Sequence, residues 1–99
     1  MINTKHYTIT REVLPIHELI GLSVNVTESK DASKKGIAGM VVNETQRMLT
    51  IETHAGEKKV PKNESIFVFD LNGEQVALEG NEIMGNPIER LKNGGKRYV

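Results

Sequence analysis

The fold is decided by one apolar stretch, Gly36-Ile37-Ala38-Gly39-Met40-Val41-Val42-Asn43-Glu44-Thr45, which a short polar turn joins to Met48-Leu49-Thr50-Ile51-Glu52-Thr53. Alternation along a strand separates two apolar faces, with Ile37, Gly39 and Val41 on one and Ala38, Met40 and Val42 on the other. Because both faces are apolar, we expect this strand to lie at the centre of a small sheet and to be covered on both sides. The second segment alternates apolar and polar residues, so the two segments predict a hairpin.

The composition indicates one small domain. Of the 99 residues, 37% are hydrophobic and only 4% aromatic, so the core must be built from Val, Ile, Leu and Met. Lys plus Arg equals Asp plus Glu at 13 each, which argues against unaided nucleic-acid binding, since such domains are usually basic. No long apolar run or signal peptide is evident, so we expect a cytoplasmic protein with no membrane association. The absence of Cys excludes disulfides and thiolate chemistry.

Turn and strand signals elsewhere predict about six short strands. Residues 22–27 alternate cleanly, and 58–62 form a short basic strand in which Pro61 favours the edge of a sheet. Residues 65–71 are apolar on both faces. Asn72-Gly73 is a favoured two-residue hairpin turn, which leads into a return strand over 74–80.

Short helices are predicted on either side of these strands. Pro15 suits the first position of a helix over 15–20 that ends at Gly21. Asn86 is suited to cap a second helix over 86–92, with Glu89 in the capping-box position. The sequence therefore predicts an all-β fold, a small twisted antiparallel barrel of about six strands with short N- and C-terminal helices. We expect the domain to span 14–92, with a flexible arm over 1–13 and a flexible basic tail over 93–99.

Nothing in the sequence predicts a catalytic or metal site. His6, His17 and His54 lie far apart in different local settings, so the spacing of metal ligands on one element is absent. Carboxylates such as Glu44 and Glu52 have no apolar sequence neighbourhood that would indicate a raised pKa. We therefore expect no catalytic residue and no bound metal in this chain.

Basic side chains gather in three segments and predict contact with nucleic-acid phosphates. That they merely solubilise loops is the alternative that stays open. Phe67 and Phe69 are expected in the core, which leaves few rings for stacking on bases. Recognition of folded RNA through shape and phosphates therefore fits better than base reading. The predicted RNA-binding residues are Lys30, Lys34, Lys35, Lys58, Lys59, Lys62 and Arg90.

The order of residues resembles a known family, archaeal ribonuclease P protein component 1, which is related to a eukaryotic subunit of ribonuclease P and MRP. The resemblance runs from about Leu14 to Arg90. It is carried by His17-Glu18-Leu19-Ile20-Gly21-Leu22, by the opening stretch over 36–45, by Met48-Leu49-Thr50-Ile51, and by Gly80 with Gly85-Asn86-Pro87-Ile88-Glu89-Arg90. One departure is Asn86, where the family commonly carries Arg before the Pro.

The resemblance implies an Sm-like (SH3-type) barrel in a ribonucleoprotein that removes the 5′ leader from precursor tRNA. There the RNA carries the catalytic site and its Mg²⁺, so this chain would be a non-catalytic subunit of an endoribonuclease and would bind no cofactor itself. The implied partners are the ribonuclease P RNA at its specificity region, a small zinc-ribbon protein subunit, other ribonuclease P proteins, and precursor tRNA as substrate. The rival interpretation is an SH3-like barrel that binds a protein without RNA. An autonomous small hydrolase is weaker still.

The resemblance also suggests what covers the second face of the opening strand. In the family, the N-terminal helix and an adjacent strand form the dock for the protein partner. The predicted partner-binding residues are Leu14, Leu19, Ile20, Met40 and Val42. The alternative is that the N-terminal helix itself buries Met40 and Val42.

Overall fold

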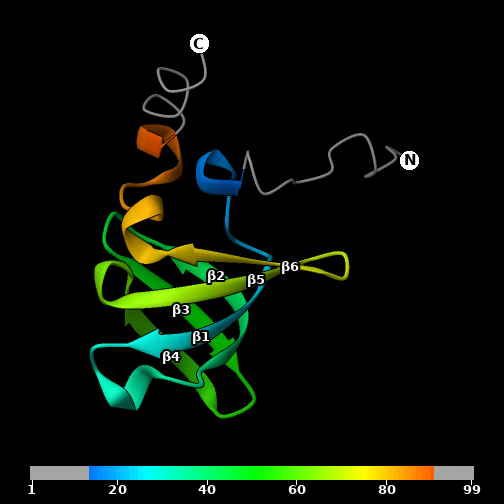
Figure 1. The fold of residues 1–99 in the computed structure, drawn as a ribbon, viewed down its shortest axis with the longest axis vertical. Coiled ribbons are helices and arrows are strands. Elements are labelled where there is room, and N and C mark those ends of the chain that lie inside the picture. Colours follow the sequence, from blue (N-terminus) through cyan, green and yellow to red (C-terminus); the bar gives the residue numbers. More distant parts are fainter. Residues whose placement is uncertain (1–13, 91–99) are drawn as a thin grey trace.

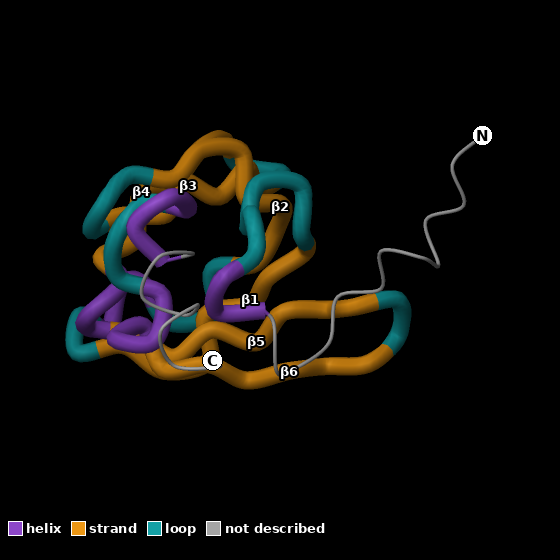
Figure 2. The backbone as a smooth tube through the Cα atoms, turned by 90° about the horizontal axis from the view of Figure 1, so that it is seen from above, coloured by secondary structure: helices purple, strands orange, loops and turns teal. Residues whose placement is uncertain are grey.

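The structure is a computed structural model that describes residues 14–90, and within them the chain folds as one six-stranded antiparallel sheet. The hydrogen-bonded order of the strands is β4-β3-β2-β1-β5-β6. The sheet curls around a common interior (Figures 1 and 2). In chain order the elements are η2 (Leu14–Ile16), β1 (Ser23–Ser29), η3 (Ala32–Lys34), β2 (Ala38–Glu44), β3 (Met48–Thr53), β4 (Gly56–Pro61), η4 (Lys62–Glu64), β5 (Ser65–Leu71), β6 (Glu74–Glu79) and η5 (Gly80–Ile83). The predicted all-β class is confirmed.

One hydrophobic core fills the curled sheet. Val41, Leu49 and Ile51 come from the predicted hairpin and are fully buried, as alternation requires. Phe67 and Phe69 of β5 are also fully buried, with their ring centroids 6.2 Å apart. The prediction that both rings belong to the core is therefore confirmed, and the aromatic side chains of the described region are not available for stacking on a ligand.

Strand β2 lies inside the sheet between β1 and β3, as predicted, but its outer face is not covered. Ala38 is exposed, Met40 is 46% exposed and Val42 is half-buried. The expectation of a strand covered on both sides is therefore wrong for the described part of the chain. The alternative in which an N-terminal helix buries Met40 is wrong for the same reason.

The segment before β1 differs from the helix predicted over 15–20. Only η2 is helical, as a single 3₁₀ turn, and a turn at Ile20 and Gly21 then leads into β1. Gly21 has φ +96°, and its N–H donates to the Val41 carbonyl oxygen at 2.8 Å. The Val41 N–H donates to the Leu22 carbonyl oxygen at 3.0 Å. The backbone of Gly21 and Leu22 therefore pairs with β2 and lengthens the β1–β2 ladder.

A bulge in β2 changes the direction of its last side chains. The β2–β3 register pairs Val41 with Ile51 and then shifts before pairing Glu44 with Leu49. Directly opposite residues in an antiparallel pair share a face. Glu44 therefore lies on the same inner face as Leu49, whereas strict alternation from Val41 would turn it outward.

Two glycines allow backbone segments to approach closely. A Cβ atom on Gly39 would overlap the carbonyl group of Glu52. A Cβ atom on Gly80 would overlap the carbonyl group of Lys62, where η5 passes η4. Any side chain at either position would push main chain against main chain, so both sites require glycine for space.

Local turn and cap signals are confirmed. Asn72 and Gly73 both have positive φ, +57° and +96°, as the β5–β6 turn requires. Asn86 and Glu89 exchange hydrogen bonds of 2.9 Å in a capping box, and helix begins at Pro87. The predicted end of that helix, the arm over 1–13 and the tail over 93–99 lie outside the described residues. Among the residues that are described, no helix is long and apolar enough to cross a membrane.

Candidate functional site

Three charged side chains meet inside the protein where β2 ends. Glu44 of β2 lies between Lys62, the first residue of η4, and Arg90 of the C-terminal helix. The side chains of Glu44 and Lys62 are 0% exposed and that of Arg90 is 2% exposed. The Lys62 Nζ atom donates to Glu44 Oε2 at 2.7 Å, and Arg90 Nη1 donates to the same oxygen. We call these three residues the charge triad.

The two cations of the charge triad also bind main chain from several segments. Beyond Glu44 they donate to backbone carbonyl oxygens at 2.6 to 3.4 Å, which are those of Pro15, His17, Gln46 and Gly85. Among the described residues, no buried side-chain nitrogen or oxygen lacks a partner. The triad thus joins the N-terminal segment, the β2–β3 turn, η4 and the C-terminal helix, which gather at one end of the sheet (Figure 1).

The charge triad carries a net positive charge. Two cations share one carboxylate, and the carbonyl dipoles provide the remaining stabilisation. Burial of the Lys62 ammonium lowers its pKa, and the hydrogen bond and charge of Glu44 partly offset this effect. Loss of Glu44 would leave two cations buried without a counter-charge, which is a costly arrangement.

The triad corrects the sequence prediction at two positions. Lys62 and Arg90 were predicted to contact RNA, but both are buried, at 0% and 3% exposure, and their donors are taken up by protein acceptors. They act within the fold and are not exposed for contact with RNA. Glu44, their shared acceptor, was not predicted as a site residue because its sequence neighbours gave no indication of a buried carboxylate.

The exposed lysines do not form one continuous surface. Lys35, at the end of the η3 loop, and Lys58, on β4, line one groove of about 310 Å³. We call it the basic groove. Its other lining residues are Gly36, Ile37, Ala38, Thr53 and His54. Lys34 precedes Lys35 and is half-buried, and Lys35 makes a 3.6 Å ion pair with Glu28 between largely exposed side chains. The structure therefore brings together one lysine from each of two predicted clusters.

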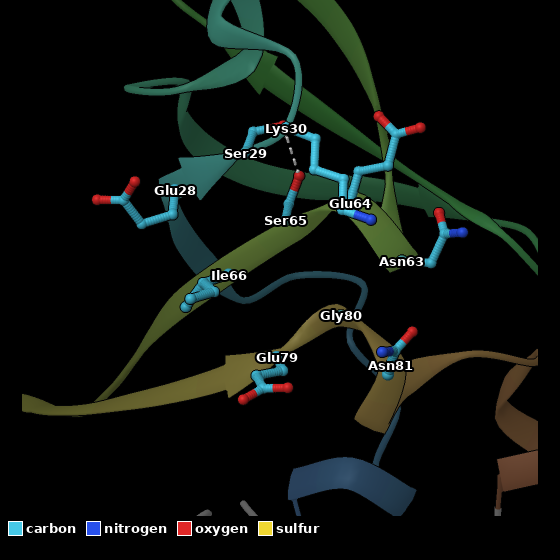
Figure 3. Close-up of a pocket in the computed structure, with 10 residues that line it drawn as sticks. All are labelled: Glu28, Ser29, Lys30, Asn63, Glu64, Ser65, Ile66, Glu79, Gly80 and Asn81. Carbon is cyan, nitrogen blue, oxygen red and sulfur yellow. Dashed lines mark hydrogen bonds between the residues drawn. The ribbon is translucent and has the colours of Figure 1, made fainter.

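Lys30 and Lys59 lie apart from the basic groove. Lys30 lines a separate cavity of about 390 Å³ between the end of β1, the η4–β5 junction and the β6–η5 junction (Figure 3). Glu28, Glu64 and Glu79 line the same cavity, so its charge disfavours a phosphate. Lys59 follows Lys58 on β4 and therefore projects from the opposite face of that strand.

The predicted partner-binding residues differ in their exposure to solvent. Leu14 and Leu19 are 0% exposed and belong to the core, so the prediction that they contact a partner is wrong for this conformation. Ile20 and Met40 are 43% and 46% exposed. Ile20 precedes Gly21 and Met40 precedes Val41. Because the Gly21 N–H donates to the Val41 carbonyl oxygen, the backbones of Ile20 and Met40 lie close together. Val42, which follows in β2, is half-buried.

Comparison with known proteins gives a consistent result. The family described as Ribonuclease P/MRP, subunit p29, matches residues 12–93. Ribonuclease P protein component 1 of Staphylothermus marinus is 44% identical over 86 residues, which cover 85% of this chain and 94% of that protein. The Methanocaldococcus jannaschii protein of the same name is 46% identical over 77 residues, which cover 77% of this chain and 81% of that protein.

A solved structure agrees with the fold. It is that of Mth11, described as a homologue of the human RNase P protein Rpp29. It superposes with a TM-score of 0.56 at 43% sequence identity, over 75% of this chain and 97% of that one. This chain belongs to the ribonuclease P/MRP subunit p29 family.

Proposed function

We propose that this chain, a protein subunit of the ribonuclease P complex, binds the RNA of that complex through the basic groove. The observation that carries the proposal is the meeting of Lys35 and Lys58 at one groove. Two cations on separate elements can contact successive phosphates of a folded RNA without reading its bases. The specificity region of the RNA is the proposed target.

The charge of the described region supports shared binding, in which other subunits contribute. Residues 14–90 contain eight Lys or Arg and twelve Asp or Glu, and two of those eight are the buried Lys62 and Arg90. An acidic body with one local basic groove would bind RNA weakly alone. We therefore propose that a zinc-ribbon protein subunit binds beside Ile20 and Met40 and that the pair engages the RNA together.

In this proposal the chain has no catalytic residue, and the 5′ leader of precursor tRNA is removed by chemistry in the RNA and its Mg²⁺. The chain contributes by holding the RNA in its active shape. The buried charge triad fits this role, because its three side chains hold the fold together and have no open position for a substrate. The rival SH3-like interpretation needs exposed aromatic side chains, whereas Phe67 and Phe69 are buried.

Reconstitution tests the proposal. The catalytic RNA and the protein subunits are assembled with and without this chain, and 5′ cleavage of precursor tRNA is measured. We expect omission of the chain to reduce cleavage at limiting Mg²⁺ and to weaken assembly of the zinc-ribbon subunit on the RNA. Equal cleavage with and without the chain over a full Mg²⁺ titration would overturn the proposal.

A further inference from the structure

The tip of the β5–β6 hairpin carries two residues whose chemistry has no part in the proposed function. Asn72 and Gly73 form the two-residue turn between the strands, and both are exposed to solvent. The hairpin reaches past the rest of the sheet in both views of the fold (Figures 1 and 2). Water therefore has access to both residues.

An Asn that precedes Gly is prone to deamidation, because glycine has no Cβ atom to hinder the reaction. After hydroxide has removed its proton, the Gly73 backbone nitrogen attacks the Asn72 side-chain carbon Cγ. The Cγ–Nδ2 bond breaks and ammonia leaves, which closes a succinimide ring. Water then opens the ring at one of its carbonyl carbons. Position 72 becomes an aspartate, linked to Gly73 through either its α- or its β-carboxyl group.

A single side chain binds the proton on which this reaction depends. The Gly73 N–H donates to the Oδ1 atom of Asp70 at 2.9 Å. A hydrogen bond to a carboxylate is stronger than one to a neutral acceptor, and it must break before hydroxide can take the proton. The negative charge of Asp70 also disfavours the amide anion that deprotonation creates. A carboxylate is too weak a base to remove an amide proton itself, so Asp70 hinders the reaction.

The geometry of the turn adds a second restraint. Leu71 and Glu74 are direct partners on either side of it. Asn72 and Gly73 are held at φ +57° and +96°, in the left-handed region that this hairpin requires. The closed turn therefore limits the backbone rotation that brings the Gly73 nitrogen to the Asn72 Cγ atom.

We propose that Asn72 is a modification site of this chain, where deamidation occurs without an enzyme and Asp70 sets the rate by holding the Gly73 N–H. The product has consequences for the hairpin. A new carboxylate at position 72 adds to those of Asp70 and Glu74 around one turn. The β-linked product also adds a backbone carbon atom, which a two-residue turn cannot accommodate without a change in geometry. Modification therefore loosens the end of the β5–β6 ladder.

The experiment follows deamidation at Asn72 in the full chain at mildly alkaline pH, by mass mapping of peptides. We expect Asp70→Ala to raise the rate by about tenfold, the effect of losing one hydrogen bond to a charged group. Asp70→Asn keeps an acceptor oxygen without the charge, so its rate should lie between those of the wild type and Asp70→Ala. The matched control Glu74→Ala removes an exposed carboxylate beside the same turn and should change the rate by about twofold or less.

Two further measurements separate the hydrogen bond from other effects. Amide hydrogen exchange at Gly73, measured by NMR, also requires hydroxide to remove this proton, so Asp70→Ala should accelerate exchange by about tenfold as well. In urea, where the turn is lost, the wild type and Asp70→Ala should deamidate at Asn72 at similar rates. Asn93-Gly94, the other Asn-Gly pair of the sequence, is followed in the same digests to correct for differences in pH and temperature between samples.

Three results would overturn the inference. An equal or slower rate at Asn72 in folded Asp70→Ala would show that the carboxylate does not protect the site. Faster deamidation with unchanged exchange at Gly73 would show that the hydrogen bond is not the cause. A wild-type rate as high in buffer as in urea would show that the folded turn gives no protection.

Discussion

The charge triad and the basic groove use the same kinds of side chain for different purposes. Lys62 and Arg90 are buried, and each donates to Glu44 and to backbone carbonyl oxygens. Lys35 and Lys58 are exposed at a groove, and Lys35 has only a solvent-exposed ion pair. A buried, fully bonded cation contributes to one conformation of the fold, whereas an exposed cation is available to a ligand. Burial therefore separates the structural cations Lys62 and Arg90 from the exposed lysines that we propose bind RNA.

Removal of the shared acceptor should have the largest effect. Glu44→Ala leaves two buried cations without a counter-charge and should reduce the free energy of unfolding by about 3–5 kcal/mol. Urea unfolding followed by circular dichroism measures the loss. The control Glu74→Ala removes an exposed carboxylate and should change stability by about 0.5 kcal/mol or less. Equal losses in the two variants would show that the triad does not stabilise the fold.

Removal of one cation should cost less. In Lys62→Met, Glu44 keeps Arg90 as its partner, so no net buried charge is left unpaired, but the carboxylate and the Gly85 carbonyl oxygen each lose a donor. We expect a loss of about 1–3 kcal/mol in the same urea experiment. A loss as large as that of Glu44→Ala would contradict the charge count on which both predictions depend.

Lys62 should also make stability depend on pH. Its folded-state pKa is lowered by burial, so between that pKa and the ordinary value of 10.5 the unfolded chain binds more protons than the folded one. In that window the contribution of Lys62 to the free energy of unfolding rises with pH, and it is lost as the pH falls through the folded-state pKa. Comparison of wild-type and Lys62→Met stability across alkaline pH isolates this contribution. Parallel curves would refute it.

Neutralisation of the basic groove should have the smallest effect on stability and a clear effect on binding. Lys35→Gln/Lys58→Gln should change the free energy of unfolding by about 0.5 kcal/mol or less. For the assembled complex, the slope of log Kobs for RNA against log salt should fall by about two. The control Lys30→Gln/Lys59→Gln carries the same charge change outside the groove. If both variants alter the slope equally, the groove has no special part in RNA binding.

Local signals in the sequence were sufficient to predict much of the fold. The Asn72-Gly73 turn and the Asn86–Glu89 capping box depend on residues close in the chain, and both are present. Strand β5 has the predicted bounds for the same reason, because apolar residues fill a segment between clear turns.

The triad could not be predicted because it depends on contacts between distant segments. Alternation from Ile37 places Glu44 outside, and a bulge of one residue near Val42 reverses that assignment. Nothing in the sequence around Lys62 distinguishes it from the exposed Lys58. The resemblance indicated contact with a partner for Leu14 and Leu19, yet both are buried in the core.

The hydrogen bond from Arg90 to the Pro15 carbonyl oxygen has a consequence for folding kinetics. It joins residues 75 positions apart in the chain. Contacts of such high sequence separation require the intervening strands to be in place first, because closing a long loop costs entropy. We therefore expect the triad to be largely unformed in the transition state. Its disruption should accelerate unfolding and leave the folding rate nearly unchanged, so the triad would control how long the folded chain persists before it unfolds.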